Sequence, residues 1–276
     1  MFKIIERKSL NPEVILLKIE APDIVHKARA GQFVILRLDE TGERIPLTIA
    51  GFNRKKGLIA IIFQVVGKTT KKLATYEEGD LICDLVGPLG KPTPVKKYGT
   101  VACVAGGVGA AIVLPVASAM KKVGNKVITI LGARNKDLLL LEKELDELST
   151  QFHVTTDDGS KGRPGFVIDI LKEVLDREKV DLVVVIGPVV MMKCSCEITK
   201  PLGVKTLVSL NPIMVDGTGM CGCCRVEVGG ETKFACVDGP DFDGHQVDFD
   251  LLIARQRIYL EEEKQALEEY QKTENR

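Results

Sequence analysis

Residues 100–115, TVACVAGGVGAAIVLP, decide the fold: they combine the residues of a buried strand, a glycine-rich turn and the first turns of an apolar helix. The helical spacing continues to Gly124, so we expect a strand over 100–107 and a helix over 110–124. A strand that leads through glycines into a helix is typical of a parallel sheet covered by helices on both faces.

The same alternation of strands and helices continues downstream to about residue 210. Near-continuous apolar runs indicate strands buried on both faces, and the segments between them have helical spacing. We therefore expect an α/β domain with a parallel sheet over residues 98–210. The sequence predicts further strands at 126–134, 153–158, 181–188 and 204–210, and further helices at 137–148 and 164–178.

Upstream of this domain, residues 1–97 consist of short segments rich in β-branched residues, separated by turn sequences such as NPE, DETGE and NRKKG. Short strands at close spacing indicate a small antiparallel β-barrel, with one helix at 69–77.

Downstream of the α/β domain, the regular pattern disappears over residues 211–250, which are rich in glycine and aspartate. A hairpin is predicted over 225–236, turning at Gly229–Gly230. The last segment, 251–276, has the composition of a charged helix.

Charge and composition exclude several classes of protein. The 276 residues contain 38 Lys plus Arg and 38 Asp plus Glu, so the net charge is zero and gives no support to nucleic-acid or membrane binding. No apolar run reaches the ~20 residues of a membrane-spanning helix, and the N-terminus lacks the apolar core of a signal peptide. We expect a cytoplasmic protein whose eight cysteines do not form disulfides.

Four of the eight cysteines lie between residues 221 and 236, beginning in the segment DGTGMCGCC. Plant-type 2Fe–2S sites use C-x4-C-x2-C and a later fourth Cys, on a glycine-rich loop. Four residues separate Asp216 from Cys221, so the aspartate occupies the first ligand position. We interpret Asp216, Cys221, Cys224 and Cys236 as cluster ligands, with Cys223 facing away.

Other interpretations of this segment stay open. A zinc knuckle or a set of reduced structural cysteines is compatible with the spacing. Cys223 could replace Asp216 as the fourth ligand if the loop rearranged, and an aspartate before a glycine is common in ordinary turns.

Further segments have the chemistry of phosphate binding. Gly106, Gly107 and Gly109 would bring backbone amides to a pyrophosphate at a helix N-terminus, although the third glycine of G-x-G-x-x-G is absent. In the barrel half, ERIPLTIAGF (43–52) places an arginine beside a Pro-Leu-Thr strand, and Gly67–Thr70 precede a helix. The alternative in each case is a turn or strand without a ligand.

These features, in this order, resemble the ferredoxin reductase-like flavoproteins. The resemblance covers nearly the whole chain and lies in RIPLTIAG, VGKTT, GPLGKP, AGGVGAA, LGARN, DDGSKGRPGFV, IGPVVMM and DGTGMCGCC. It is closer to the small subunits of electron-bifurcating NADH-dependent reduced ferredoxin:NADP oxidoreductases than to the electron-transfer subunits of dihydroorotate dehydrogenase, which have four cysteine ligands. It implies an FAD-binding β-barrel (1–97), a pyridine-nucleotide domain (98–210), a 2Fe–2S segment (211–250) and a C-terminal helix (251–276).

The resemblance also implies the residues that hold the cofactors. The FAD isoalloxazine would be lined by Pro46, Leu47 and Thr48, and its phosphates would meet Arg44, Gly67, Lys68, Thr69 and Thr70. NAD(H) would be held by Gly106, Gly107, Gly109, Ala110, Arg134, Asp157, Gly187 and Pro188. Arg44 lies four residues before Thr48, where the family commonly has three, and the family's flavin-stacking tyrosine is missing near Leu47.

NAD(H) is expected to be preferred over NADP(H). Arg134 could hold a 2′-phosphate, but the carboxylates of Asp137, Asp157 and Asp158 would oppose one placed near them.

The implied activity is hydride transfer between NAD(H) and FAD and electron relay through the cluster, so no catalytic acid–base residue is expected. His26, His153 and His245 have no assigned role. Because no second cysteine group could hold a 4Fe–4S cluster, electrons would leave to a larger flavin and 4Fe–4S subunit, which would couple ferredoxin, NAD(H) and NADP(H). The alternatives are the dihydroorotate dehydrogenase subunit and, in another class, a non-catalytic metal-binding redox sensor.

Overall fold

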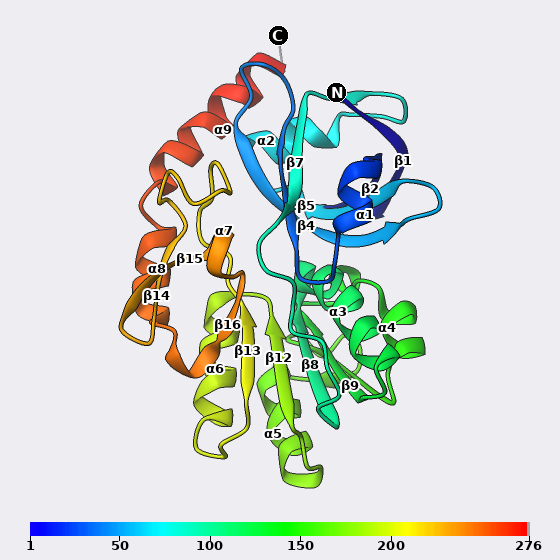
Figure 1. The fold of residues 1–276 in the computed structure, drawn as a ribbon, viewed down its shortest axis with the longest axis vertical. Helices are drawn as coiled ribbons and strands as arrows, with labels where there is room; N and C mark the ends of the chain where they lie inside the picture. Colours follow the sequence, from blue (N-terminus) through cyan, green and yellow to red (C-terminus); the bar gives the residue numbers. More distant parts are fainter. Residues whose placement is uncertain (275–276) are drawn as a thin grey trace.

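Two seven-stranded sheets lie one above the other along the long axis of the molecule, and the C-terminal segment runs beside both (Figure 1). The computed structural model describes residues 1–274. Within that range, no helix is long and apolar enough to cross a membrane.

The first sheet is an antiparallel barrel with the strand order β6-β1-β2-β5-β4-β3-β7. Its two edge strands are separated only by Cys83, so the sheet curls until its edges come close together and the barrel is nearly closed. This confirms the predicted barrel. Its strands are β1 (Phe2–Asn11), β2 (Val14–Glu20), β3 (Phe33–Arg37), β4 (Arg44–Asn53), β5 (Leu58–Gln64), β6 (Leu81–Ile82) and β7 (Asp84–Leu89).

Alternating aliphatic side chains fill the barrel, among them Leu17, Ile19, Leu36 and Ile61, all fully buried. The predicted helix at 69–77 forms as α2 (Lys68–Ala74), and a second short helix, α1 (Pro22–Lys27), was not predicted.

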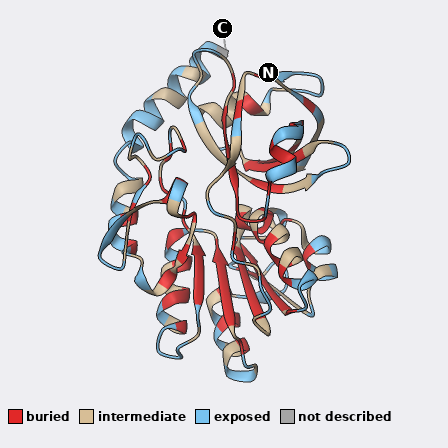
Figure 2. Cartoon of the chain, in the orientation of Figure 1, coloured by how far each residue is buried: buried red, intermediate tan, exposed pale blue. Residues whose placement is uncertain are grey.

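The second sheet has the order β11-β10-β9-β8-β12-β13-β16 and confirms the predicted parallel sheet, with only β16 antiparallel. The apolar runs are its central strands, which are buried along their lengths (Figure 2). Its strands are β8 (Thr100–Gly106), β9 (Lys126–Ala133), β10 (Gln151–Thr156), β11 (Arg163–Pro164), β12 (Leu182–Ile186), β13 (Thr206–Ser209) and β16 (Asp241–Asp243). Its helices are α3 (Ala110–Lys122), α4 (Glu142–Leu148), α5 (Val167–Arg177) and α6 (Val189–Thr199).

Several elements of this domain differ from the prediction. The two-residue strand β11 was not predicted, and the helix expected at 164–178 begins at Val167, after that strand. The helix expected at 137–148 begins only at Glu142, because Leu141 takes a left-handed conformation (φ 56°) after a short 3-10 turn at Lys136–Leu138. Helix α6 was not predicted, and neither was β16, which comes from the C-terminal segment and pairs with β13.

The C-terminal segment contains the predicted hairpin, formed by β14 (Arg225–Val228) and β15 (Glu231–Phe234). Gly229 and Gly230 both have positive φ, as the tight turn requires. The charged tail forms two helices rather than one. The remaining elements are α7 (Ala235–Asp238), a 3-10 turn (Gly244–Gln246), α8 (Phe249–Gln256) and α9 (Leu260–Glu274), the last of which runs up to α2 of the barrel (Figure 1). Residues 275–276 of the predicted helix lie outside the described range.

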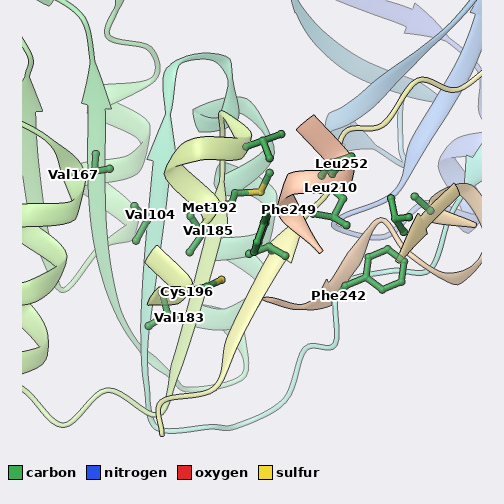
Figure 3. Close-up of a cluster of buried hydrophobic side chains, with 14 of the residues drawn as sticks. Val104, Val167, Val183, Val185, Met192, Cys196, Leu210, Phe242, Phe249 and Leu252 are labelled. Carbon is green, nitrogen blue, oxygen red and sulfur yellow. The ribbon is translucent and has the colours of Figure 1, made fainter. Parts of the chain in front are cut away.

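One hydrophobic core joins the C-terminal segment to its neighbours. Phe242, Phe249 and Leu252 of this segment pack in the same cluster as Val185 and Met192 of the parallel sheet and its helix (Figure 3). Phe33 and Ile35 of the barrel, together with Cys224 and Cys236, belong to that cluster too. The three parts of the chain therefore hold one another in place.

Candidate cofactor-binding sites

The order in which the chain adds strands to the parallel sheet reverses at β8. From β8 the chain adds β9 and β10 on one side and then returns to add β12 on the other, so β8 and β12 are neighbours. Ligands of open α/β sheets bind in the crevice outside the carboxyl ends of the strands at such a switch point. The predicted NAD(H) residues lie at the carboxyl ends of β8, β9, β10 and β12, from the last residue of β8 to the first residue of α3 and in the connections that follow the other strands: Gly106, Gly107, Gly109, Ala110, Arg134, Asp157, Gly187 and Pro188.

The glycines of this crevice are required by close packing. A Cβ at Gly109 would lie 2.2 Å from the carbonyl oxygen of Ile186, and one at Gly106 would lie 2.6 Å from Sδ of Met191. Gly187 meets the same methionine, with 2.6 Å to its Cε. Gly107 has a positive φ (56°) and open space beside it, so its backbone can approach a ligand at the start of α3.

Arg134 and Asp157 follow β9 and β10 and are both exposed. The backbone N–H of Asp157 donates to the carbonyl of Ala133 at 3.1 Å, and that of Asp158 donates to the carbonyl of Arg134 at 3.2 Å. The cationic side chain of Arg134 and the anionic side chains of Asp157 and Asp158 therefore lie on neighbouring backbone segments that are hydrogen-bonded to each other. Hydrogen bonds from Ser160 lower the pKa of Asp158, so this carboxylate stays charged.

Strand β4 divides the predicted flavin residues between its two faces, because side chains alternate along a strand. Leu47 packs against the barrel core, as does Ile45. Arg44, Pro46 and Thr48 stand on the opposite face.

The turn that begins α2 is held by Thr70, whose hydroxyl accepts from the N–H of Gly67 at 2.9 Å and from that of Val66 at 3.0 Å. A residue that the sequence analysis missed also lies here. Glu43 pairs with Nζ of Lys68 at 3.1 Å and accepts from the hydroxyl of Thr69 at 3.0 Å. The structure therefore brings the start of β4 and the start of α2 together, with an acidic group between them.

The cysteine segment is partly assembled. Cys224 and Cys236 are buried, with their Sγ atoms 3.1 Å apart and not bonded, whereas Cys221 is exposed. Burial and the neighbouring Cys224 thiol raise the pKa of Cys236 to about 12, and the backbone N–H of Gly219 acts in the opposite direction. Burial and the adjacent Cys221 raise the pKa of Cys223. Within residues 1–274, no three His, Cys, Asp or Glu side chains converge as metal ligands do.

Asp216 is held by the loop that follows it. Its Oδ1 accepts from the N–H of Thr218 at 2.6 Å, and its Oδ2 accepts from the N–H of Cys221 at 2.8 Å. These bonds lower its pKa, that from Thr218 most. The intervening Gly217 has a positive φ, and a Cβ there would lie 2.7 Å from both Ile35 and Leu89 of the barrel.

These features fit an iron–sulfur cluster. Two buried, unbonded thiols in contact, a backbone N–H directed at one of them and an ionised carboxylate on a glycine-rich loop are the donor chemistry of such a site. The loop lies against the barrel, so a cluster held here would lie beside the proposed flavin domain.

Comparisons with known proteins agree with this arrangement. Residues 103–197 match the family model of the oxidoreductase NAD-binding domain, and residues 211–248 match the iron–sulfur cluster binding domain of dihydroorotate dehydrogenase B. A dihydroorotate dehydrogenase B (NAD(+)) electron transfer subunit homolog of Thermotoga maritima is 47% identical, covering 98% of this chain and 96% of the relative. An uncharacterised protein of Clostridium beijerinckii is 51% identical over 96% of this chain and 93% of its own.

A solved structure of an NADH-dependent reduced ferredoxin-NADP oxidoreductase, described in connection with flavin-based electron bifurcation, has a chain that is 46% identical, with 98% of each chain covered and a TM-score of 0.93. Fold and site thus define an oxidoreductase of the ferredoxin reductase-like class, with an NAD-binding and an iron–sulfur domain. More narrowly, the chain belongs to the family of dihydroorotate dehydrogenase B electron-transfer subunits and their homologues. The predicted resemblance is confirmed.

Proposed function

We propose that the chain is the small subunit of an electron-bifurcating NADH-dependent reduced ferredoxin:NADP oxidoreductase, with FAD, a 2Fe–2S cluster and NAD(H) as its cofactors. When bound, these cofactors exchange a hydride between NAD(H) and FAD and pass single electrons through the cluster. The observation that carries the proposal is Asp216, separated by four residues from Cys221 and held there as an ionised carboxylate. The similarity of the whole chain to the bifurcating enzyme supports it.

In this proposal, Pro46 and Thr48 line the flavin ring from the outer face of β4, and Leu47 contributes its backbone, because its side chain packs inward. Arg44 and the turn Gly67–Thr70 hold the diphosphate. For Lys68 to bind a phosphate, its ion pair with Glu43 has to break.

NAD(H) would bind across the switch point, with its pyrophosphate over Gly107 and the N-terminus of α3. Arg134 and Asp157 stand at the same edge of the sheet and would meet the adenosine half. The two adjacent carboxylates of Asp157 and Asp158 disfavour a 2′-phosphate, so we propose a preference for NAD(H).

The cluster would be held by Asp216, Cys221, Cys224 and Cys236, with Cys223 outside the ligand set. Because Cys221 is exposed, the cluster would lie near the surface, where electrons can leave to a larger subunit that carries flavin and 4Fe–4S clusters. Through that subunit the complex would use ferredoxin.

The visible spectrum and metal content of the purified chain test the proposal, followed by reduction with NADH and with NADPH. Flavin bands, cluster absorption, two irons per chain and faster reduction by NADH are expected. A colourless protein with stoichiometric zinc would instead identify the non-catalytic module, and a clear NADPH preference would overturn the nucleotide assignment.

The second candidate function is the electron-transfer subunit of dihydroorotate dehydrogenase, which the family match over residues 211–248 favours. The partner that co-purifies from the native source separates the two. A larger subunit with its own flavin and 4Fe–4S cysteines supports the bifurcating enzyme, whereas a dihydroorotate-oxidising barrel protein supports the alternative.

A further inference from the structure

One hydrogen bond ties together three parts of the molecule. The hydroxyl of Thr93, in the connection between the barrel and the parallel sheet, donates to Oδ2 of Asp241 at 2.5 Å. Asp241 is the first residue of β16, in the C-terminal segment, and pairs with Ser209 at the end of β13. The Ser209 hydroxyl, like that of Thr93, favours the charged form of this carboxyl group and so opposes a raised pKa.

Backbone hydrogen bonds surround this contact. The N–H of Lys91 donates to the carbonyl of Gly239 at 2.6 Å, and that of Leu210 donates to the carbonyl of Pro240 at 2.9 Å. On the barrel side, the N–H of Thr93 donates to the carbonyl of Ala30 at 2.9 Å. The connection from the barrel is therefore held between the barrel and the C-terminal segment.

The carboxyl group of Asp241 is in an unfavourable environment. Its Oδ1 is buried and has no hydrogen-bond partner among the described residues. Burial raises the pKa of Asp241, and the hydroxyls of Thr93 and Ser209 only partly oppose this. The nearest connecting segments carry Lys91 and Asp238, which pair with each other at 3.8 Å.

A buried polar group of this kind is costly, but a hydrogen-bonded set of such groups specifies a single arrangement of the elements that carry it. Here the elements lead directly to both proposed cofactor sites. Cys236 on α7 lies five residues before Asp241. A Cβ at Gly31, two residues before β3, would lie 2.1 Å from the Thr93 hydroxyl, and β3 pairs along its length with the flavin strand β4.

We propose that Thr93 and Asp241 are positioning residues, whose hydrogen bond fixes the iron–sulfur segment against the flavin barrel and thereby sets the distance that electrons cross between the two cofactors. The inference rests on the proposed function. Electron tunnelling slows steeply with distance, so a looser junction slows reduction of the cluster. Neither residue lies in the loops that follow β8 and β12, so we expect hydride transfer at that edge of the sheet to change less than cluster reduction.

Thr93→Val removes the hydroxyl at nearly constant volume, and Thr93→Ser restores it. Thr129→Val is the matched control, because Thr129 is an equally buried threonine whose hydroxyl bonds to Ser149, away from the C-terminal segment. Hydrogen–deuterium exchange of the full chain gives a readout that is independent of activity. Thr93→Val is expected to speed exchange at the amides of Lys91 and Leu210, and neither Thr93→Ser nor Thr129→Val is.

Rapid mixing of the cofactor-loaded chain with NADH then follows flavin and cluster absorption separately. In Thr93→Val we expect flavin reduction within about twofold of wild type and cluster reduction slower by ~10- to 100-fold, the scale that a misplacement of about 1 Å costs a positioned reaction. Thr93→Ser should recover the rate. Unchanged cluster reduction in Thr93→Val, or an equal loss of both rates, overturns the proposal. If NADH does not reduce the flavin of the wild-type chain, the proposed function itself is refuted instead.

Should Thr93→Val not fold, Asp241→Ala carries the test, because it removes the acceptor of the Thr93 hydroxyl, whereas Asp241→Asn keeps one acceptor oxygen. Asp241→Ala is expected to speed exchange at Lys91 and Leu210 and to slow cluster reduction, and Asp241→Asn to change both less. Equal exchange and equal cluster reduction in the two variants contradict the role assigned to Asp241.

Discussion

The carboxylate of Asp216 accepts a 2.8 Å hydrogen bond from the backbone N–H of Cys221, so the two outer members of the D-GTGM-C loop are tied to each other. A second bond, from the N–H of Thr218, lowers the pKa of Asp216. Metal ligands have to be deprotonated, and the hydrogen bonds of this loop favour the ionised carboxylate. The same hydrogen bonds occur in an ordinary aspartate turn. Substitutions are therefore needed to distinguish whether Asp216 is a cluster ligand or only a turn residue.

Asp216→Cys is expected to assemble a 2Fe–2S centre with a changed reduction potential and electron paramagnetic resonance spectrum, because a carboxylate oxygen is a harder donor than a thiolate. Asp216→Ala should lower iron retention by ~10- to 100-fold. Removing a residue that only hydrogen-bonds to a metal ligand already causes a loss of this size, so removing a ligand should cost at least as much. Iron content and spectra of the purified variants give the answer.

Cys223→Ser is the control for this series and should leave the cluster unchanged. If it abolishes the cluster while Asp216→Ala keeps the wild-type spectrum, the ligands are Cys221, Cys223, Cys224 and Cys236. The argument for the bifurcating enzyme from Asp216 then fails.

Glu43→Gln is expected to tighten FAD binding, because it removes a negative charge beside the proposed diphosphate site and frees Lys68. Lys68→Met should weaken binding. Both side chains are about half exposed, so solvent screening limits each change to about fivefold in Kd. Titration of the flavin-free chain with FAD measures the effect, and high salt should reduce it. Tighter binding of FMN than of FAD would count against a diphosphate site at this turn.

Gly109→Ala is expected to destabilise the nucleotide domain by about 1–3 kcal/mol, because the new Cβ would meet the rigid carbonyl of Ile186. Gly51→Ala is the matched control in a strand, since its Cβ would lie 3.7 Å from Ala60, an ordinary contact. Urea unfolding of both variants checks the difference. If the two variants are equally stable, the loop after β12 can move to accept the new Cβ. The close packing between the β8 and β12 loops then does not contribute to stability.

The sequence was sufficient where local patterns agree with the fold. Apolar runs such as DLVVVIGP and the helix from Ala110 identified the parallel sheet, and Gly229–Gly230 located the hairpin. Helix α6 was missed because VVMMKCSCEIT is largely apolar and has weak helical periodicity directly after a strand. Strand β16 has three residues and exists only because β13 offers it a partner.

The sites show the same limit. The spacing of Asp216 and the cysteines can be read locally, but Glu43 and Lys68 are separated by the whole of β4 and β5 and meet only in the folded barrel. Alternation along β4 could have shown that Leu47 points inward, since Ile45 and Ile49 share its face. Nothing in the sequence connects Thr93 with Asp241, because their contact depends on how three parts of the chain pack.

The last prediction concerns the pH dependence of stability. Burial raises the pKa of Asp241 above its ordinary value of 3.8, so the folded chain holds this proton more tightly than the unfolded chain does. The free energy of unfolding therefore falls as pH rises from about 3.8 through the raised pKa. Asp241→Asn lacks this contribution, so its stability relative to wild type should increase with pH over that window.

Carboxylates with lowered pKa, such as Asp39 and Glu178, contribute in the opposite direction, but equally in both proteins, and they cancel in the difference. Urea unfolding of wild type and variant at several pH values gives that difference directly. If the stability of Asp241→Asn relative to wild type stays constant or decreases as pH rises, Asp241 is charged at no greater cost in the folded chain than in the unfolded one. Oδ1 of Asp241, which is buried and has no hydrogen-bond partner among the described residues, would then have to be in contact with water.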